Sequence, residues 1–317
     1  MTFDRPARTR RIALVIACLS APLAAPVRAQ QVADTTFDTR VARPAYAKDG
    51  PRLLFDEAHH EFHRTDGRYR PFAELASHDG YRVTANADTF SASSLANADL
   101  LVIANALGDD DMGAPAASHP AFTPAECAAV VAWVRAGGSL LLIADHAPMG
   151  DAAKPLGVAL GVDMRAAYTA DRHRSEGGGP TMLHYRPGQG LHDDHPIVAG
   201  RDSSERVRHV LAFTGQSLSG PADAVSLLTL SADAEDLLIH LGESTNNVPR
   251  DKHRPAGGRS QGLAFTLGRG RVVVLGEAAM LTAQVAGPQR MPMGMNVAGT
   301  DDRQFALNVL HRLTRAL

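Results

Sequence analysis

Cysteine is almost absent from this chain of 317 residues, which contains only Cys18 and Cys127. Cys18 falls in a predicted leader segment, so the remaining chain cannot form an intramolecular disulfide. A secreted protein of this length can be stabilised by its hydrophobic core instead. Cys127 lies within a helical pattern, and we expect it to be a buried structural thiol.

Aromatic residues and an excess of positive charge are also lacking. Aromatic residues make up 5% of the chain, and its formal net charge is −2. Because there is no basic stripe, we expect neither nucleic acid nor an anionic membrane as a partner. The low aromatic content counts mildly against carbohydrate recognition by stacking on exposed rings.

Three common motifs are missing as well. The chain has no Gly-x-Ser-x-Gly, no Walker loop and no Gly-x-Gly-x-x-Gly after its first expected strand. These absences disfavour hydrolysis by a serine nucleophile, phosphate-loop chemistry and dinucleotide binding.

The N-terminus predicts export. Residues 1–29 combine a basic start, an apolar run over Ile12–Leu19 and small residues up to Ala29, as in a cleaved signal peptide. The apolar run is too short to span a membrane, so we expect a periplasmic or secreted protein without a transmembrane span. Two alternatives stay open: a twin-arginine signal at Thr9–Arg11, and a lipoprotein anchored through Cys18. Loss of five arginines and one aspartate would change the charge from −2 to −6 (−2 − 5 + 1).

The rest of the chain predicts an N-terminal arm or linker over residues 30–50 and a single α/β domain over residues 51–317. Strand and helix patterns alternate, which is typical of a doubly wound, mostly parallel sheet. The expected strands are Arg52–Asp56, Tyr81–Asn86, Asp99–Ala106, Ser139–Ala144, His209–Thr214, Ala224–Leu230, Gln261–Leu267 and Arg271–Leu275, the last two forming a C-terminal hairpin. The expected helices are Tyr69–His78, Ser91–Ala96, Pro124–Arg135, Ala278–Gln284 and Asp301–Leu317. Residues 166–207 predict a long loop over the sheet, of the kind that forms lids or binding loops.

The segment Asp56–His63 (Asp-Glu-Ala-His-His-Glu-Phe-His) concentrates imidazoles and carboxylates directly after the first expected strand. Ligands bind outside the carboxyl ends of strands in open α/β sheets, so this segment is a candidate site. His59 and His63 are four residues apart and would share one face of a helical turn. With Asp56 or Glu57 nearby, they could bind Zn²⁺ or a similar divalent metal.

Two other interpretations of the same segment stay open. One imidazole, from His59, His60 or His63, could act as a general base that a carboxylate orients. Alternatively, some of these side chains only hydrogen-bond the loop and others are solvated.

Asp145 and His146 end the fourth expected strand, and Glu277 follows the last one. Neighbouring parallel strands would bring His146 close to Asp56–His63, where it could complete a catalytic or metal site. Asp145 could instead cap the next helix, and Glu277 could cap the helix expected over Ala278–Gln284.

A further group of polar residues lies in the middle of the chain, at His192–Pro196, with His173 and His184 nearby. These residues could form a lid over the crevice. A solvated loop that turns at Pro196 is the favoured interpretation, because X-Pro units usually mark turns.

Four stretches resemble the class I glutamine amidotransferase-like superfamily, and within it the trehalose-utilisation-type (ThuA-like) proteins. They are Leu54–His60, Trp133–His146, Asp194–Ile197 followed by Gly200, and Gly270–Glu277. The resemblance implies a flavodoxin-like fold and a carbohydrate-linked context. The superfamily's amidotransferases carry a cysteine near the position of His146, which this chain lacks, so glutamine hydrolysis through a thioester is not expected.

The leading hypothesis is an exported hydrolase-type enzyme for a small polar substrate, with carbohydrates among the candidates. Its catalytic residues would come from Asp56, Glu57, His59, His60, His63, Asp145, His146 and Glu277. Their chemistry would be acid–base or metal-assisted, with His59, His63 and His146 as candidate metal ligands. A non-catalytic carbohydrate- or partner-binding module is the main alternative, and a structural envelope protein is a third.

Overall fold

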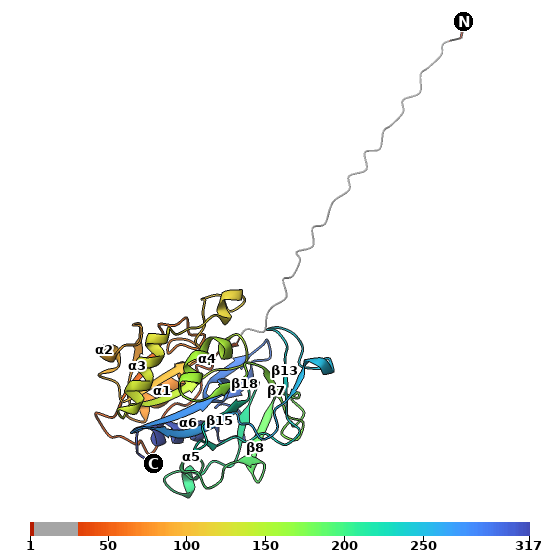
Figure 1. The fold of residues 1–317 in the computed structure, drawn as a ribbon. Coiled ribbons are helices and arrows are strands. Elements are labelled where there is room, and N and C mark those ends of the chain that lie inside the picture. Colours follow the sequence, from red (N-terminus) through yellow and green to blue (C-terminus); the bar gives the residue numbers. More distant parts are fainter. Residues whose placement is uncertain (3–30) are drawn as a thin grey trace.

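The computed structural model describes residues 31–317 together with Met1 and Thr2 (Figure 1). The predicted signal peptide and the alternative anchor at Cys18 therefore lie, apart from these two residues, outside the described part of the chain. Of the described helices, none combines the length and the apolar character that crossing a bilayer requires.

A mixed seven-stranded sheet forms the centre of the fold, in the order β12-β15-β16-β5-β4-β2-β3. The strands from β3 to β16 are parallel, whereas at one edge β15 is antiparallel to β16 and β12 is antiparallel to β15. In chain order, the parallel strands are arranged 2-1-3-4-5, so the direction of winding reverses between β2 and β4. The strands are β2 (Arg52–Asp56), β3 (Arg82–Asn86), β4 (Leu100–Ala104), β5 (Ser139–Ile143), β12 (Val225–Ser226), β15 (Gly262–Leu267) and β16 (Gly270–Leu275).

Helices cover both faces of this sheet, as expected for a doubly wound arrangement (Figure 1). On one face, Phe72 and Phe305 pack with Phe55 and Val102 in a single buried cluster. On the other face, Leu95, Val130 and Leu156 pack with the alternate residues of the same strands. Successive residues of a strand point to opposite faces, so β4 and β5 are buried throughout. The helices are α1 (Arg70–His78) and α6 (Asp302–Leu313) on the first face, and α2 (Ala92–Leu95), α3 (Pro124–Arg135) and α4 (Met149–Ala159) on the second.

Helix α3 begins with the capping pattern that its sequence predicts. The Thr123 hydroxyl accepts the backbone N–H of Glu126, and the Glu126 carboxylate accepts the backbone N–H of Thr123. Cys127, in the first turn of the same helix, is buried and free, as expected.

We expect Thr123→Ala to lower the free energy of unfolding by about 1 kcal/mol, because the N–H of Glu126 would lose its acceptor. Thr123→Ser keeps the hydroxyl and is the matched control. Chemical denaturation measures both variants, and equal losses in the two would contradict a capping role for the hydroxyl.

The long unstructured loop predicted for residues 166–207 is wrong, because this region forms short strands. These strands pair with one another and with later segments, which satisfies their backbone groups. In Figure 1, β7, β8 and β13 lie together on the side of the molecule away from α2 and α3. The small elements are β6 (Asp163–Met164), β7 (Tyr168–Ala170), β8 (Leu183–Pro187), β9 (Gly190–Leu191), α5 (Pro196–Ala199), β10 (Val210–Ala212), β11 (Leu218–Ser219), β13 (Glu235–Leu237) and β14 (His253–Pro255), with 3₁₀ turns at Pro115–Ser118, Ser203–Glu205 and Arg250–Lys252.

The predicted C-terminal hairpin is confirmed, since β15 and β16 pair antiparallel along their full length. The predicted helix over Ala278–Gln284 is wrong. A 3₁₀ turn, η4 (Ala279–Leu281), is followed there by β17 (Ala283–Ala286), which pairs with β18 (Met291–Gly294) and with β1 (Gln31–Ala33). Strand partners from both ends of the chain outweigh the local helical pattern.

The N-terminal arm lies against the domain rather than apart from it. Besides the pairing of β1 with β17, the ring of Tyr46 packs edge-on against Tyr81, with ring centroids 5.3 Å apart. The backbone N–H of Ala45 donates to the carboxylate of Asp79, at the end of α1.

Candidate functional site

Polar residues gather at the carboxyl ends of the parallel strands, as the sequence predicts. Asp56 ends β2, Asn105 follows β4, Asp145 follows β5 and Glu277 follows β16. This edge includes the point between β2 and β4 where the winding reverses, which is where open α/β sheets bind ligands.

Five of the eight predicted site residues nevertheless fall into two groups, and the other three lie outside both. The first, which we call the Asp56 group, consists of Asp56, His59, Glu61 and Glu126. The second, the Asp145 group, consists of Asp145, His146 and Glu277 with the partners described below. No hydrogen bond or ion pair between described side chains joins the two groups directly.

The Asp56 group is centred on the imidazole of His59, and both of its ring nitrogens contact carboxylates. Nδ1 lies 2.7 Å from Oδ2 of Asp56, and Nε2 lies 2.8 Å from Oε1 of Glu126, on α3. The rings of Phe90 and Phe122 pack against the imidazole, with centroids 4.6 and 4.8 Å away. All members are almost fully buried.

Burial and charge act against each other in this group. Burial disfavours the charged imidazole, but the hydrogen bonds and charges of Asp56 and Glu126 outweigh it and raise the pKa of His59. Burial, with the neighbouring carboxylate of Asp56, raises the pKa of Glu61 to about 10. The Oε1 atom of Glu61 is buried and has no hydrogen-bond partner among the described residues.

Glu57 and His60 make their side-chain contacts outside both groups. Glu57 accepts the backbone N–H and the hydroxyl of Thr65 and forms an ion pair with Arg64, so it holds the loop in place. His60 is exposed and contacts the exposed Asp110. Glu57 thus fits the interpretation that some of these side chains only hydrogen-bond the loop, and His60 fits the interpretation that others are solvated.

His63 has different neighbours from His59. Its ring packs against Tyr69, with centroids 4.7 Å apart, and the Tyr69 hydroxyl donates to the carbonyl of Ala278. Burial lowers the pKa of His63 to about 3, and the charge of Arg68 acts in the same direction. His63 is therefore a neutral core histidine beside the Asp145 group.

This neutral imidazole predicts a loss of stability in acid. The unfolded chain would protonate His63 near pH 6.5, whereas the folded chain would not do so until about pH 3. The unfolded state thus binds more protons between these values, and stability falls as the pH is lowered through this window, by at most about 1.4 kcal/mol per pH unit. Urea denaturation between pH 7 and 4 should show a shallower decline for His63→Phe than for the wild type. Equal slopes would contradict the assignment.

Asp145 is held by one side chain and one backbone group. Its Oδ2 accepts the side-chain amide of Asn105 at 2.7 Å, and its Oδ1 accepts the backbone N–H of Ala278 at 2.8 Å. Burial raises the pKa of Asp145 to about 7, even though both hydrogen bonds favour the charged form. Asn105 also accepts the N–H of Phe62 through its backbone carbonyl, which connects this group to the Asp56–His63 segment.

The imidazole of His146 has one fixed nitrogen and one unused one. Nδ1 lies 2.7 Å from the carbonyl oxygen of Ala147, and since that oxygen can only accept, Nδ1 carries the proton. Burial lowers the pKa of His146 to about 4, so the ring is neutral at pH 7. Nε2 then carries a lone pair and makes no hydrogen bond to another described residue. The ring stacks on Tyr168, with centroids 3.7 Å apart.

Glu277 lies too deep to reach a substrate directly, with 1% of its surface exposed. Its carboxylate accepts the backbone N–H groups of Ala279 and Met280 and so caps the turn η4. Burial and the nearby charge of Asp145 raise its pKa well above the ordinary value. These contacts fit the predicted capping role of Glu277, but the element that it caps is a 3₁₀ turn rather than the expected helix.

A pocket of about 770 Å³ lies beside the chain segment that follows His146, and His146 itself is not among its lining residues. The two residues that follow His146 in the chain, Ala147 and Pro148, form part of its wall. Its other lining residues are Asp111, Met112, Gly113, Ala114, Ser118, His240, Leu241 and Gly242.

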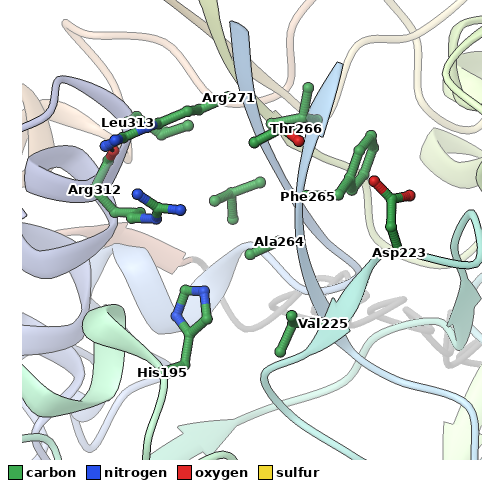
Figure 2. A pocket seen from close by; sticks show the side chains of 11 residues that line it. His195, Asp223, Val225, Ala264, Phe265, Thr266, Arg271, Arg312 and Leu313 are labelled. Atoms are coloured by element: carbon green, nitrogen blue, oxygen red, sulfur yellow. Dashed lines mark hydrogen bonds between the residues drawn. The ribbon is translucent and has the colours of Figure 1, made fainter. Parts of the chain in front are cut away.

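A smaller cavity, of about 140 Å³, contains none of the predicted catalytic residues. Figure 2 shows His195 and Arg312 pointing into it, with Arg271 and Asp223 on its walls. Arg271 is the second residue of β16, so this cavity lies away from the carboxyl ends of the parallel strands. His195 caps the short helix α5 by accepting the N–H of Ile197, so the predicted change of direction at Pro196 is present, but His195 is buried rather than solvated.

The candidate metal ligands His59, His63 and His146 lie in three different environments. Ligand atoms that approach one another within 4.8 Å belong to Asp56, His59 and Glu61. His63 and His146 pack instead against Tyr69 and Tyr168.

Several residues of the site have no motif that would reveal them in the sequence. Asn105 had a usable signal, because it directly follows a strand with a continuous apolar run. Tyr69, Tyr168 and Gln216 had none. The Gln216 amide donates to the carbonyls of Ala144 and Asp145 and so shapes the turn that presents His146.

Neither a family model nor a curated protein matches this chain. Among solved structures, the mmIFT52 N-terminal domain matches with a TM-score of 0.54 and 15% identity, over 83% of this chain and 97% of that one. This likeness shows a shared fold. A cytoplasmic protein from Salmonella typhimurium matches with a TM-score of 0.49 and 14% identity, over 83% and 99%. A protein described as ThuA-like, from Bacteroides uniformis, matches with a TM-score of 0.43 and 12% identity, over 86% and 93%.

Proposed function

We propose that this chain is an exported hydrolase-type enzyme, of flavodoxin-like architecture and related to the ThuA-like proteins, in which His146 acts as the general base. The parallel strand order 2-1-3-4-5 supports the architecture, because it is the flavodoxin-like order. The N-terminal sequence pattern supports export, and the four resembling stretches support the relation to the ThuA-like proteins. Membership of the amidotransferase-like superfamily is part of the same proposal.

The observation that carries the proposal is the state of His146. A neutral imidazole with its Nδ1 proton held by a carbonyl presents its Nε2 lone pair in one direction, as a general base requires. The stacked ring of Tyr168 restricts its rotation. In the proposed reaction, Nε2 takes a proton from a water molecule that attacks the substrate.

Asp145 is the candidate for the second proton-transfer step. With a pKa of about 7, this carboxyl group is partly protonated near neutral pH and could return a proton to the leaving group. Asn105 and the backbone of Ala278 hold it in one orientation. A pair of groups with pKa values moved in opposite directions is a common arrangement of acid–base sites.

The pocket beside Ala147 and Pro148 is the proposed substrate site. It is large enough for a small polar molecule of the size of a monosaccharide derivative, so carbohydrates are one candidate class. Glu57 and His60 have no role in bond cleavage in this scheme. The fold around the site is supported by Asp56, His59, His63 and Glu277.

A substrate panel tests the proposal. The purified chain would be incubated with chromogenic esters, amides and glycosides, and free monosaccharides would be titrated by calorimetry. Turnover on one class that is lost in His146→Gln and retained in His119→Gln, which replaces an exposed imidazole, supports the proposal. Turnover that survives in His146→Gln contradicts it.

A non-catalytic binding module is the second candidate. The specific observation in its favour is that Glu277, Glu57 and His59 are already occupied by bonds within the protein. Saccharide binding by calorimetry, without turnover of any member of the panel, would favour this alternative.

A further inference from the structure

The buried Asp56 group contains more side chains that can carry negative charge than side chains that can carry positive charge. Asp56, Glu61 and Glu126 are carboxylates, and their described hydrogen-bond and ion-pair partners include a single group that can carry positive charge, His59. The side chains of Asp56 and Glu61 are fully buried. Buried carboxylates are costly unless a proton or a cation neutralises them.

We propose that this group is a binding site for a divalent transition-metal cation, held by Asp56, Glu61 and Nδ1 of His59. It lies apart from the Asp145 group, and it does not depend on the reaction proposed for His146. One imidazole and two carboxylates form a donor set suited to Zn²⁺ and to similar ions.

The surroundings of His59 match those of a metal-bound histidine. Such a residue donates its second ring N–H to a carboxylate or carbonyl, which fixes the ring and makes the other nitrogen a better ligand. Here Nε2 lies 2.8 Å from Glu126, while Nδ1 faces the carboxylates of Asp56 and Glu61. Glu126 is itself fixed by the capping interaction with Thr123.

The distances allow a cation with small movements. Nδ1 of His59 lies 2.7 Å from Oδ2 of Asp56 and 3.8 Å from Oε1 of Glu61. Ligands about 2.0–2.2 Å from a metal lie roughly 3.0–3.5 Å from one another, so Nδ1 would move slightly away from Asp56 and slightly toward Glu61, within a set of ligand atoms that all lie within 4.8 Å of one another. Asn86 donates to the other oxygen of Asp56 and orients that carboxylate. The unpartnered Oε1 of Glu61 would gain a bond.

A proton is the competing occupant. A protonated Glu61 could donate to Asp56, which would also remove the excess charge. Glu61→Gln separates the two possibilities, because a glutamine amide can still donate to Asp56, whereas a neutral amide is a much poorer metal ligand. If Glu61 and Asp56 share a proton, Glu61→Gln should have a stability close to that of the wild type. If they hold a metal, Glu61→Gln should no longer bind it.

The experiment uses the purified full chain, stripped with EDTA and titrated with Zn²⁺. Bound metal is measured by elemental analysis after desalting, and the unfolding temperature is measured with and without the metal. We expect about one equivalent of zinc per chain and a higher unfolding temperature for the wild type. Glu61→Gln should lose retained zinc, and Glu126→Gln should bind it about 10–100-fold more weakly.

His60→Asn is the matched control. It removes an exposed imidazole from the same loop, and asparagine tolerates the left-handed backbone (φ 53°) of this position. We expect it to bind zinc like the wild type. Equal zinc binding by the wild type and Glu61→Gln, or no zinc binding by a folded wild type, would overturn the proposal. Neither result bears on the role of His146.

Discussion

The variant His146→Gln is expected to hydrolyse the best substrate about 10²–10⁴-fold more slowly than the wild type, the usual effect of removing a general base. Glutamine keeps a polar group of similar length but cannot accept a proton near neutral pH. The fold should be retained, because the hydrogen bond of His146 is to its own neighbour, Ala147. The readout is kcat/KM together with the circular dichroism spectrum.

The pH profile provides a second readout for the same variant. Since burial lowers the pKa of His146 to about 4, the wild-type base is unprotonated above this pH and is lost as the pH falls through it. The value of kcat/KM should therefore fall about tenfold per pH unit below about pH 4, within the range where the protein stays folded. The residual activity of His146→Gln should lack this limb. An unchanged limb in the variant would assign it to another group.

We expect Asp79→Ala to lower the free energy of unfolding by about 2–5 kcal/mol, more than the other substitutions predicted to affect stability. The Asp79 carboxylate, at the end of α1, contacts Nε2 of His311 at 2.6 Å and accepts the backbone N–H of Ala45 at 2.8 Å. Asp79 and His311 are fully buried, so removal of the carboxylate leaves the buried imidazole without a partner, at about 1–3 kcal/mol, and the partly buried N–H of Ala45 without an acceptor, at about 1–2 kcal/mol. It would also remove the side-chain contacts that link α1 to the N-terminal arm and to α6.

Glu74→Ala is the matched control on the same helix. Glu74 pairs with Arg70 one turn earlier, and both side chains are exposed. Surface pairs of this kind contribute about 0.3–0.5 kcal/mol. Urea denaturation measures both variants at one pH. Comparable losses for Asp79→Ala and Glu74→Ala would show that the buried contact is not important for stability.

The sequence predicted the central sheet well, because its strands have strong local patterns. The apolar runs of β4 and β5 and the helix signals around Thr123 and Pro124 depend on neighbouring residues only. The predictions failed where pairing is with distant segments. Residues 283–286 form a strand because β1 and β18 lie beside them, and no local pattern contains that information.

The candidate site shows the same division. The sequence placed polar residues at the carboxyl ends of parallel strands, which is correct for Asp56 and Asp145. The strands that carry them, β2 and β5, are not neighbours, because β4 lies between them. The sequence did not predict that the polar residues would form two groups. His59 and His63 are only four residues apart, yet one contacts Glu126 on α3 and the other packs against Tyr69.

The order of residues alone therefore determined which segments become buried strands and helices, and which chemical groups follow the strands, because period and local capping are short-range properties. Only the tertiary structure decided what those groups can do. Burial against Tyr168 keeps His146 neutral, while Asp56 and Glu126 favour the charged form of His59. The pKa and the free lone pair of an imidazole depend on its neighbours in space, and here those neighbours come from elements far apart in the chain.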